Sequence, residues 1–257
     1  MQLAHSSDDS PAAAVADGGP ASPMRLIVSG PTAPGTDPKD TLRKWLAARL
    51  VGRWQNGSSL VRNPDAPASR EDGAVKPDNA FFFGTEDPRG IKCPFGAHIR
   101  RANPRDTRLH STPEESRAEV AGVNRHRILR VGRAYGYYDG VGDAQQKHEG
   151  LLFMCLNADI ERQFEFIQKT WIFNRNIHGL EDEPDPLIAR NPLDADGKPI
   201  PRKFTIPLPS GPLRIDINHD FVRVVGGGYF FLPSRSALRY LSGGVLGRLH
   251  DVLQGPH

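Results

Sequence analysis

The sequence predicts an α+β fold that contains an antiparallel sheet and long loops. In the second half of the chain, segments with strand patterning alternate with helical segments, and most connections between them are irregular. The 257 residues include 26 glycines and 23 prolines, which indicates an unusual share of loop. Hydrophobic residues make up 38% and charged residues 25%, so a core of moderate size is expected, in one large domain or two small ones.

Residues 1–40 are expected to form a flexible N-terminal segment. They are rich in Ala, Ser, Pro, Gly and Asp, and such a composition cannot bury enough apolar surface to offset the entropy of ordering. Order is expected over residues 41–257. It begins with a helix that Asp40 can cap, and its apolar residues recur at helical spacing: Leu42, Trp45, Leu46 and Leu50. Residues 55–94 read as loops, with a short extended segment at 80–84.

Two strands and a helix are predicted in the middle of the chain. Residues 126–136 and 150–158 read as strands, and the second is so continuously apolar that burial on both faces is expected. Residues 137–149 between them read as a connecting loop. A helix follows, capped by Asn157 or Asp159, with one apolar stripe: Ile160, Phe164, Ile167 and Trp171.

The last part of the chain predicts a hairpin and a short helix. Residues 179–202 are rich in Pro, Asp and Asn and read as irregular. Residues 221–233 read as two strands joined by a glycine turn. A short helix capped by Ser234 or Ser236 follows the second of these strands.

Composition excludes several classes of partner. The net charge of +3 is too balanced for a general nucleic-acid binder, and no apolar run approaches the roughly 20 residues of a membrane span. The N-terminus lacks the pattern of a secretory signal, so a cytoplasmic location is expected. Two cysteines, Cys93 and Cys155, cannot form a disulfide framework.

Residues 92–111 and the strand after them carry the clearest chemistry. Nine arginines and no lysine lie between Arg100 and Arg133, a bias that favours bidentate recognition of carboxylate or phosphate. His98 lies within this run and is a candidate metal ligand beside anion-binding arginines. A haem, with an iron and two propionates, would satisfy both features, and so would a phosphorylated ligand. A lone histidine is more often a structural or surface residue.

Several ordered motifs resemble the dye-decolourising (DyP-type) haem peroxidases. They are CPFGAHIRRANPR (93–105), RILRVGRAYG (127–136), GLLFMCLNADIERQFEFIQKTW (150–171) and FVRVVGGGYFFLPS (221–234). The resemblance implies that residues 41–257 form the C-terminal ferredoxin-like domain of such an enzyme, an antiparallel sheet with helices on one face, of the dimeric α+β barrel type. It further implies haem b as cofactor, hydrogen peroxide as oxidant, and dyes or phenolic compounds as the small aromatic reductant.

The resemblance also implies roles for individual residues. His98 matches the iron ligand, and Arg130 matches the arginine on the opposite, distal side of the haem. Leu151 and Phe153 match residues that line the distal side, and strand alternation independently places them on one face of their strand. Asp185 matches the carboxylate that accepts the other ring N–H of the histidine, which fixes the tautomer and strengthens the imidazole as a donor.

Other interpretations of these positions remain open. Arg105 is a weaker candidate for a propionate partner. Arg130 could instead be a buried ion-pair partner, and Asp185 could simply form an Asp-Pro turn. Cys93, beside the histidine motif, is expected to be an inert thiol rather than a thiolate ligand.

The resemblance stops short of the whole family pattern. Family members carry an upstream ferredoxin-like domain with a GxxDG motif, and no such motif precedes His98 here. GYYDG at 136–140 follows Arg130, so Asp139 is expected to be a turn residue. The sequence therefore resembles only the C-terminal half of a peroxidase, truncated or split.

Three functions follow from this pattern. The chain could be a haem peroxidase, a haem-binding protein without efficient turnover, or a non-catalytic remnant domain that acts through protein contacts. In each case the apolar strand at 150–156 is expected to need a partner surface, either a second copy in a homo-oligomer or a separately encoded N-terminal half.

Overall fold

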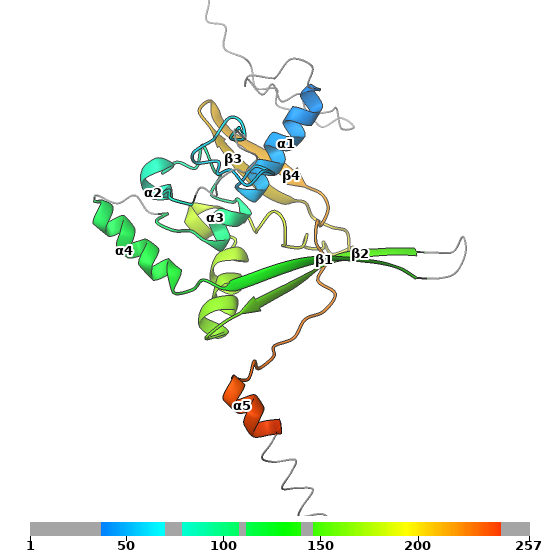
Figure 1. Ribbon diagram of the computed structural model, residues 1–257. Coiled ribbons are helices and arrows are strands. Elements are labelled where there is room, and N and C mark those ends of the chain that lie inside the picture. Colours follow the sequence, from blue (N-terminus) through cyan, green and yellow to red (C-terminus); the bar gives the residue numbers. More distant parts are fainter. Residues whose placement is uncertain (1–36, 70–78, 108–111, 140–145, 243–257) are drawn as a thin grey trace, which may run out of the picture. The chain divides into compact units, whose positions relative to one another are not determined.

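The computed structural model describes residues 37–69, 79–107, 112–139 and 146–242 (Figure 1). The chain divides into two compact units, Met1–Asp220 and Phe221–His257. Most of the predicted flexible segment at 1–40 lies outside the described residues. Among the residues that are described, no helix is long and apolar enough to cross a bilayer.

Helix α1 spans Pro38–Val51 and begins earlier than its sequence pattern predicted. The cap is Asp37, whose carboxylate accepts a hydrogen bond from the Lys39 N–H at 3.0 Å. The prediction of Asp40 as cap is therefore wrong, because Pro38 favours the first helical position and sets the start of the helix. Asp40 instead lies in the first turn and pairs with Lys44.

The region after α1 consists of loops and short helices. The predicted loops at 55–94 are interrupted by one helical turn, α2 (Phe83–Glu86). Helices α3 (His98–Ala102) and α4 (Pro113–Asn124) follow, and no sequence pattern predicted either. A capping box between Thr112 and Glu115 starts α4.

A two-stranded antiparallel sheet, β3 (Arg202–Leu208) and β4 (Gly211–Ile217), contributes to the core of the first unit, although no pattern predicted these strands (Figure 1). Alternate residues of β3 point inward, so Phe204 and Ile206 are fully buried. The core joins residues of α1, α2, the loops and this sheet: Trp45, Ala48, Trp54, Leu60, Val61, Phe81, Phe83, Cys93, Ala97, Phe204, Ile206 and Ile217.

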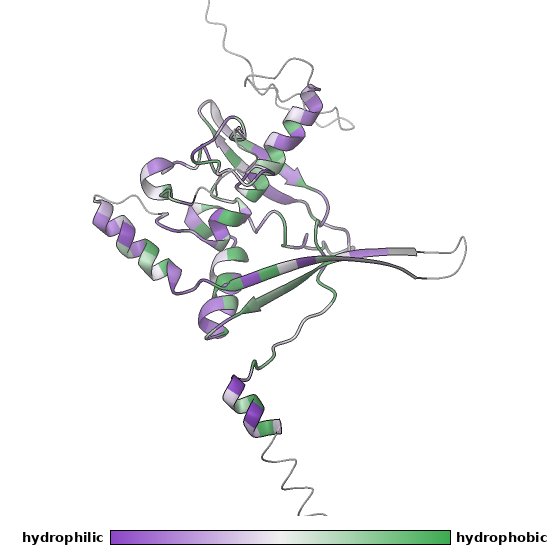
Figure 2. Ribbon diagram, viewed as in Figure 1, coloured by the Kyte–Doolittle hydropathy of each residue, from purple (hydrophilic) through white to green (hydrophobic). Residues whose placement is uncertain are grey.

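The other sheet is the antiparallel hairpin of β1 (Leu129–Asp139) and β2 (Gln146–Leu156), which confirms both predicted strands. The strands run further toward the turn than expected, because 137–139 and 146–149 belong to the ladder rather than to a loop. The prediction that the second strand is buried on both faces is wrong. Its apolar side chains are 45–66% exposed, since a two-stranded sheet supplies only one neighbour: Leu151, Leu152, Phe153, Met154 and Leu156. Figure 2 shows the hydrophobic character of this part of β2.

The predicted helix after β2 is present in a widened form. Its turns, η2 (Glu161–Glu165) and η3 (Ile167–Ile172), contain hydrogen bonds that span five residues, such as the one from the Glu165 N–H to the Ile160 carbonyl at 3.0 Å. Of the two candidate caps, Asp159 is the one that accepts from a backbone N–H of the first turn, at 3.0 Å. A short turn, η4 (Ile177–Gly179), leads into the irregular segment.

The second unit contains helix α5 (Arg235–Tyr240), whose cap is Ser234, as predicted. The two strands predicted at 221–233 are absent, and these residues form no ladder. Their apolar side chains are largely exposed, with Phe230 at 88% and Phe231 at 87%. A strand needs a hydrogen-bonded neighbour, so high strand propensity alone does not form one. The fold class is nevertheless confirmed, because the chain combines helices with antiparallel sheets.

Candidate functional site

The site is built around His98, the first residue of α3. A turn closed by a hydrogen bond from the Ala97 N–H to the Pro94 carbonyl leads into the helix. The imidazole is 29% exposed, and its Nδ1 lies 2.8 Å from Oδ2 of Asp185. The structure therefore brings together two residues that are 87 positions apart in the sequence.

Asp185 is fully buried and uses both of its oxygens. Oδ1 accepts hydrogen bonds from the N–H groups of Leu187 at 2.9 Å and Ile188 at 3.0 Å, and Oδ2 faces His98. The residue thus forms its local Asp-Pro turn and holds the imidazole at the same time.

The surroundings of Asp185 favour its ionised form. Burial alone would raise the pKa of Asp185, but the hydrogen bond and charge of His98, together with the two backbone N–H groups, lower it overall. An ionised carboxylate is only an acceptor, so Nδ1 of His98 is the donor. When the imidazole is neutral, its one N–H is the Nδ1–H that faces Asp185, and Nε2 carries a lone pair that can bind a metal.

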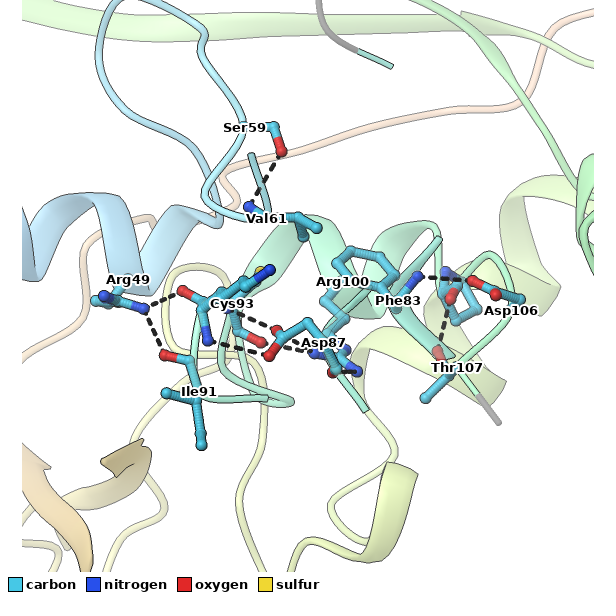
Figure 3. A network of polar contacts seen from close by, with 12 residues as sticks. Arg49, Ser59, Val61, Phe83, Asp87, Ile91, Cys93, Arg100, Asp106 and Thr107 are labelled. Carbon is cyan, nitrogen blue, oxygen red and sulfur yellow. Dashed lines mark hydrogen bonds and ion pairs between the residues drawn. The ribbon is translucent and has the colours of Figure 1, made fainter. Parts of the chain in front are cut away.

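Arg100, a residue of α3, has its polar partners inside the chain (Figure 3). It is fully buried, donates to Oδ2 of Asp87 at 3.0 Å and to the Cys93 carbonyl at 2.7 Å, and lies 4.4 Å from the ring centroids of Phe83 and Phe95. Asp87 also accepts from the Cys93 N–H. The expectation that the arginines of this motif bind an anionic ligand is therefore wrong for Arg100, because its partners lie within the chain.

Arg101 is equally buried and also turned inward. Its guanidinium donates to four backbone carbonyls, those of Gly96, Ile172, Asn174 and Glu183. It too is unavailable to an anion. Burial lowers the pKa of both arginines.

Cys93 is buried beside Arg100, to which its carbonyl is hydrogen-bonded. Burial raises the pKa of its thiol to about 12, which agrees with an inert thiol rather than a thiolate ligand. No group of three or more His, Cys, Asp or Glu residues within the described ranges is arranged to hold a metal ion. A metal at His98 would therefore need most of its ligands from another source.

Arg130, Leu151 and Phe153 share one face of the β1–β2 hairpin. The ladder pairs Arg130 with Cys155, and Phe153 and Leu151 follow at every second position, so all three side chains point the same way. Arg130 is exposed, which contradicts its interpretation as a buried ion-pair partner. No hydrogen bond between described residues joins this group to His98.

Arg105 and Asp139 are the remaining positions that the sequence singled out. Arg105 has a positive φ of 56° and donates to the carbonyls of Asn79 at 2.8 Å and Phe81 at 3.2 Å, with its guanidinium 4.0 Å from the Phe81 ring centroid. A role toward a propionate stays a prediction. Asp139 is the last residue of β1, and its side chain lies outside the described part.

Comparison with known proteins identifies relatives of this chain. The chain is 33% identical over 212 residues to the dye-decolorizing peroxidase msp1 of Mycetinis scorodonius. This match covers 76% of this chain and 38% of the relative. It is 32% identical over 218 residues to the multifunctional dye peroxidase DyP2 of Amycolatopsis sp., covering 77% of this chain and 42% of the relative. No family model matches the sequence.

Solved structures give the same result. A triple mutant of the dye-decolorizing peroxidase from Auricularia auricula-judae superposes with a TM-score of 0.59 at 27% identity, covering 84% of this chain and 48% of that one. Over about three quarters of its length, the chain is thus a relative of the DyP-type peroxidases. It spans about two fifths of the length of the curated relatives that it matches.

Proposed function

We propose that the chain is the haem-binding part of a DyP-type peroxidase, which uses hydrogen peroxide to oxidise dyes or phenolic compounds. The observation that carries the proposal is the hydrogen bond between Nδ1 of His98 and buried Asp185, which leaves Nε2 free to bind iron. The named relatives are dye peroxidases, and one solved relative, with a TM-score of 0.60, is described by its engineered heme pocket.

The residues present fit haem b. A porphyrin supplies four nitrogen ligands to its iron, so one protein ligand is sufficient, and His98 is the candidate. Leu151 and Phe153 offer an apolar surface to a flat ring, and Arg130 offers a cation beside them. Arg105 is the proposed propionate partner. The bound haem would supply the redox chemistry with peroxide.

Each of these site residues has a definite role in the proposed reaction. Asp185 holds the proton on Nδ1, which keeps the imidazole in one tautomer and makes it a stronger electron donor. Arg130 places a permanent positive charge where negative charge develops on the peroxide oxygen that leaves. Leu151 and Phe153 exclude water from that side.

The hairpin also indicates a partner. Large apolar side chains on both of its faces are exposed, and a monomer rarely leaves so many in one place. The relatives are more than twice as long as the matched segment. We therefore propose that a second copy or a separately encoded N-terminal half covers this surface.

Peroxide-dependent oxidation of a dye by the hemin-loaded chain tests the proposal, with Arg130→Leu as the variant. We expect Arg130→Leu to keep its haem absorption and to lose roughly 10²-fold or more in rate, because a charged donor at the reacting oxygens is removed. Arg133 lies on the opposite face of β1, so Arg133→Leu is the matched control and should leave the rate unchanged. Equal rates in all three proteins would contradict the role of Arg130. Haem binding without oxidation would favour a haem-binding protein without efficient turnover.

A further inference from the structure

We propose that Arg101 is a positioning residue that fixes the hydrogen bond between His98 and Asp185. This inference rests on the proposed function only in taking His98 as the iron ligand. It is carried by the identity of the carbonyls that Arg101 binds, those of Gly96 and Glu183. Gly96 lies two residues before His98, and Glu183 lies two residues before Asp185.

One rigid group therefore spans the two segments that must meet. Nε of Arg101 donates to the Gly96 carbonyl at 3.0 Å, and Nη2 donates to the Glu183 carbonyl. The guanidinium is planar, so donors on two of its nitrogens hold the two carbonyls in a fixed relation. Nη1 adds the Asn174 carbonyl at 2.9 Å, which ties in the chain after η3.

The segment that carries Asp185 is held from its other side as well. The carboxylate of Glu183 accepts from the Thr205 N–H at 2.9 Å and from the Thr205 hydroxyl, which joins the segment to β3. With Arg101 on its carbonyl and Thr205 on its side chain, Glu183 is fixed at both ends. Asp185 lies two residues further along the chain, so the contacts that fix Glu183 also restrain Asp185.

A direct role of Arg101 toward a ligand does not fit the geometry. The side chain has no exposed surface, and each of its three nitrogens already donates to a carbonyl. Lysine would keep the positive charge but offers a single ammonium on a flexible stem, which cannot span two carbonyls in one plane. Arg101→Lys therefore separates the planar geometry from the charge.

The test observes the His98 Nδ1–H proton directly, by NMR of the histidine-¹⁵N-labelled full chain without haem. Asp185→Asn identifies the resonance by removing its ionised acceptor. We expect Arg101→Lys to broaden the resonance and to speed its exchange with water at least tenfold. Arg100→Lys is the matched control: it lies one position earlier, is equally buried, and binds Asp87 and Cys93 instead. We expect Arg100→Lys to leave the resonance in place.

The proposal is overturned if Arg101→Lys keeps the parent resonance and exchange rate, or if both lysine variants lose it equally. Should Arg101→Lys not fold, Thr205→Val decides, because it loosens the Glu183 anchor from the opposite side. Faster exchange in Thr205→Val supports the proposal, and an unchanged resonance overturns it.

The same variants separate this inference from the proposed function. Because the readout needs no haem, a chain that binds no hemin but responds as expected would refute the function and leave Arg101 as a positioning residue. A chain that binds hemin at His98 but shows no response to Arg101→Lys would refute only the positioning role. In hemin-loaded protein, we expect the iron–histidine vibration of Arg101→Lys to shift toward that of Asp185→Asn.

Discussion

The segment around α3 and the β1–β2 hairpin contribute the two groups of site residues, and they are stabilised in opposite ways. Around α3, charged side chains are buried and find their partners inside the chain, as Arg100 does with Asp87. On the hairpin, large apolar side chains are exposed, with Leu151 at 66%. Contacts within this chain therefore position His98, whereas the face that carries Arg130, Leu151 and Phe153 is exposed, and we propose that another polypeptide or a ligand covers it.

Removal of one buried guanidinium should expose this difference most strongly. Arg100→Met leaves Asp87 buried without its cation, and breaking a buried ion pair in this way costs about 3–5 kcal/mol in the free energy of unfolding. Arg133→Met on the exposed hairpin should stay within about 0.5 kcal/mol. Denaturant unfolding measures both. Similar losses in the two variants would mean that the α3 segment is no more tightly determined than the hairpin.

Acid should destabilise the fold through His178 of η4, whose ring centroid lies 6.3 Å from that of Phe95. Burial, together with the charges of Arg100 and Arg101, lowers the pKa of His178 to about 4. The unfolded chain binds this proton more readily, so stability is lost as the pH falls from about 6.5 to about 4, by roughly 2–4 kcal/mol. His178→Asn, which suits the positive φ of 57° at this position, should flatten the profile. An equally steep acid limb in that variant would assign the effect to other groups.

A pair of glycine substitutions compares the packing of the two regions. A Cβ at Gly96 would lie 3.1 Å from the buried Phe204 ring, so Gly96→Ala should cost about 1–3 kcal/mol. A Cβ at Gly150 would collide with the tip of Tyr135, but this side chain is 44% exposed and can swing into solvent. Gly150→Ala should therefore cost less than about 1 kcal/mol. Thermal unfolding of both variants checks the order, and the reverse order would contradict the comparison.

Polar substitution on the hairpin should change association rather than stability. Leu152 and Met154 lie on the face opposite to Arg130 and are about half exposed, at 52% and 50%. The double variant Leu152→Lys, Met154→Lys should alter the free energy of unfolding by about 0.5 kcal/mol or less. It should bind less hydrophobic dye and sediment as a smaller species than the parent. Identical sedimentation and dye binding would show that this face needs no partner.

The sequence predicted local elements better than distant contacts. The hairpin strands, the helix after them and the Ser234 cap all follow from patterns within about 15 residues. The β3–β4 sheet was missed because Pro207 and Pro212 interrupt its strands, and proline normally argues against a strand. The two prolines lie opposite each other beside the turn, where the ladder tolerates them.

Burial and long-range contacts were the least predictable. The continuous apolar run of β2 indicated burial on both faces, but the structure offers only one neighbouring strand. The pairing of His98 with Asp185 followed from the resemblance to a family, since no spacing connects residues 87 positions apart. Nothing in the sequence distinguished Arg101 from the other arginines, because its role depends on carbonyls more than 70 residues away.

A hemin titration of the purified chain tests whether His98 is the iron ligand, with His98→Ala as the variant. His126→Ala is the matched control, because the His126 ring stacks on Phe166, with ring centroids 3.9 Å apart. We expect a Soret band that saturates at about one haem per chain, survives in His126→Ala and is lost in His98→Ala. An unchanged band in His98→Ala, or no saturable band in the parent chain, would contradict the assignment of His98 as the iron ligand.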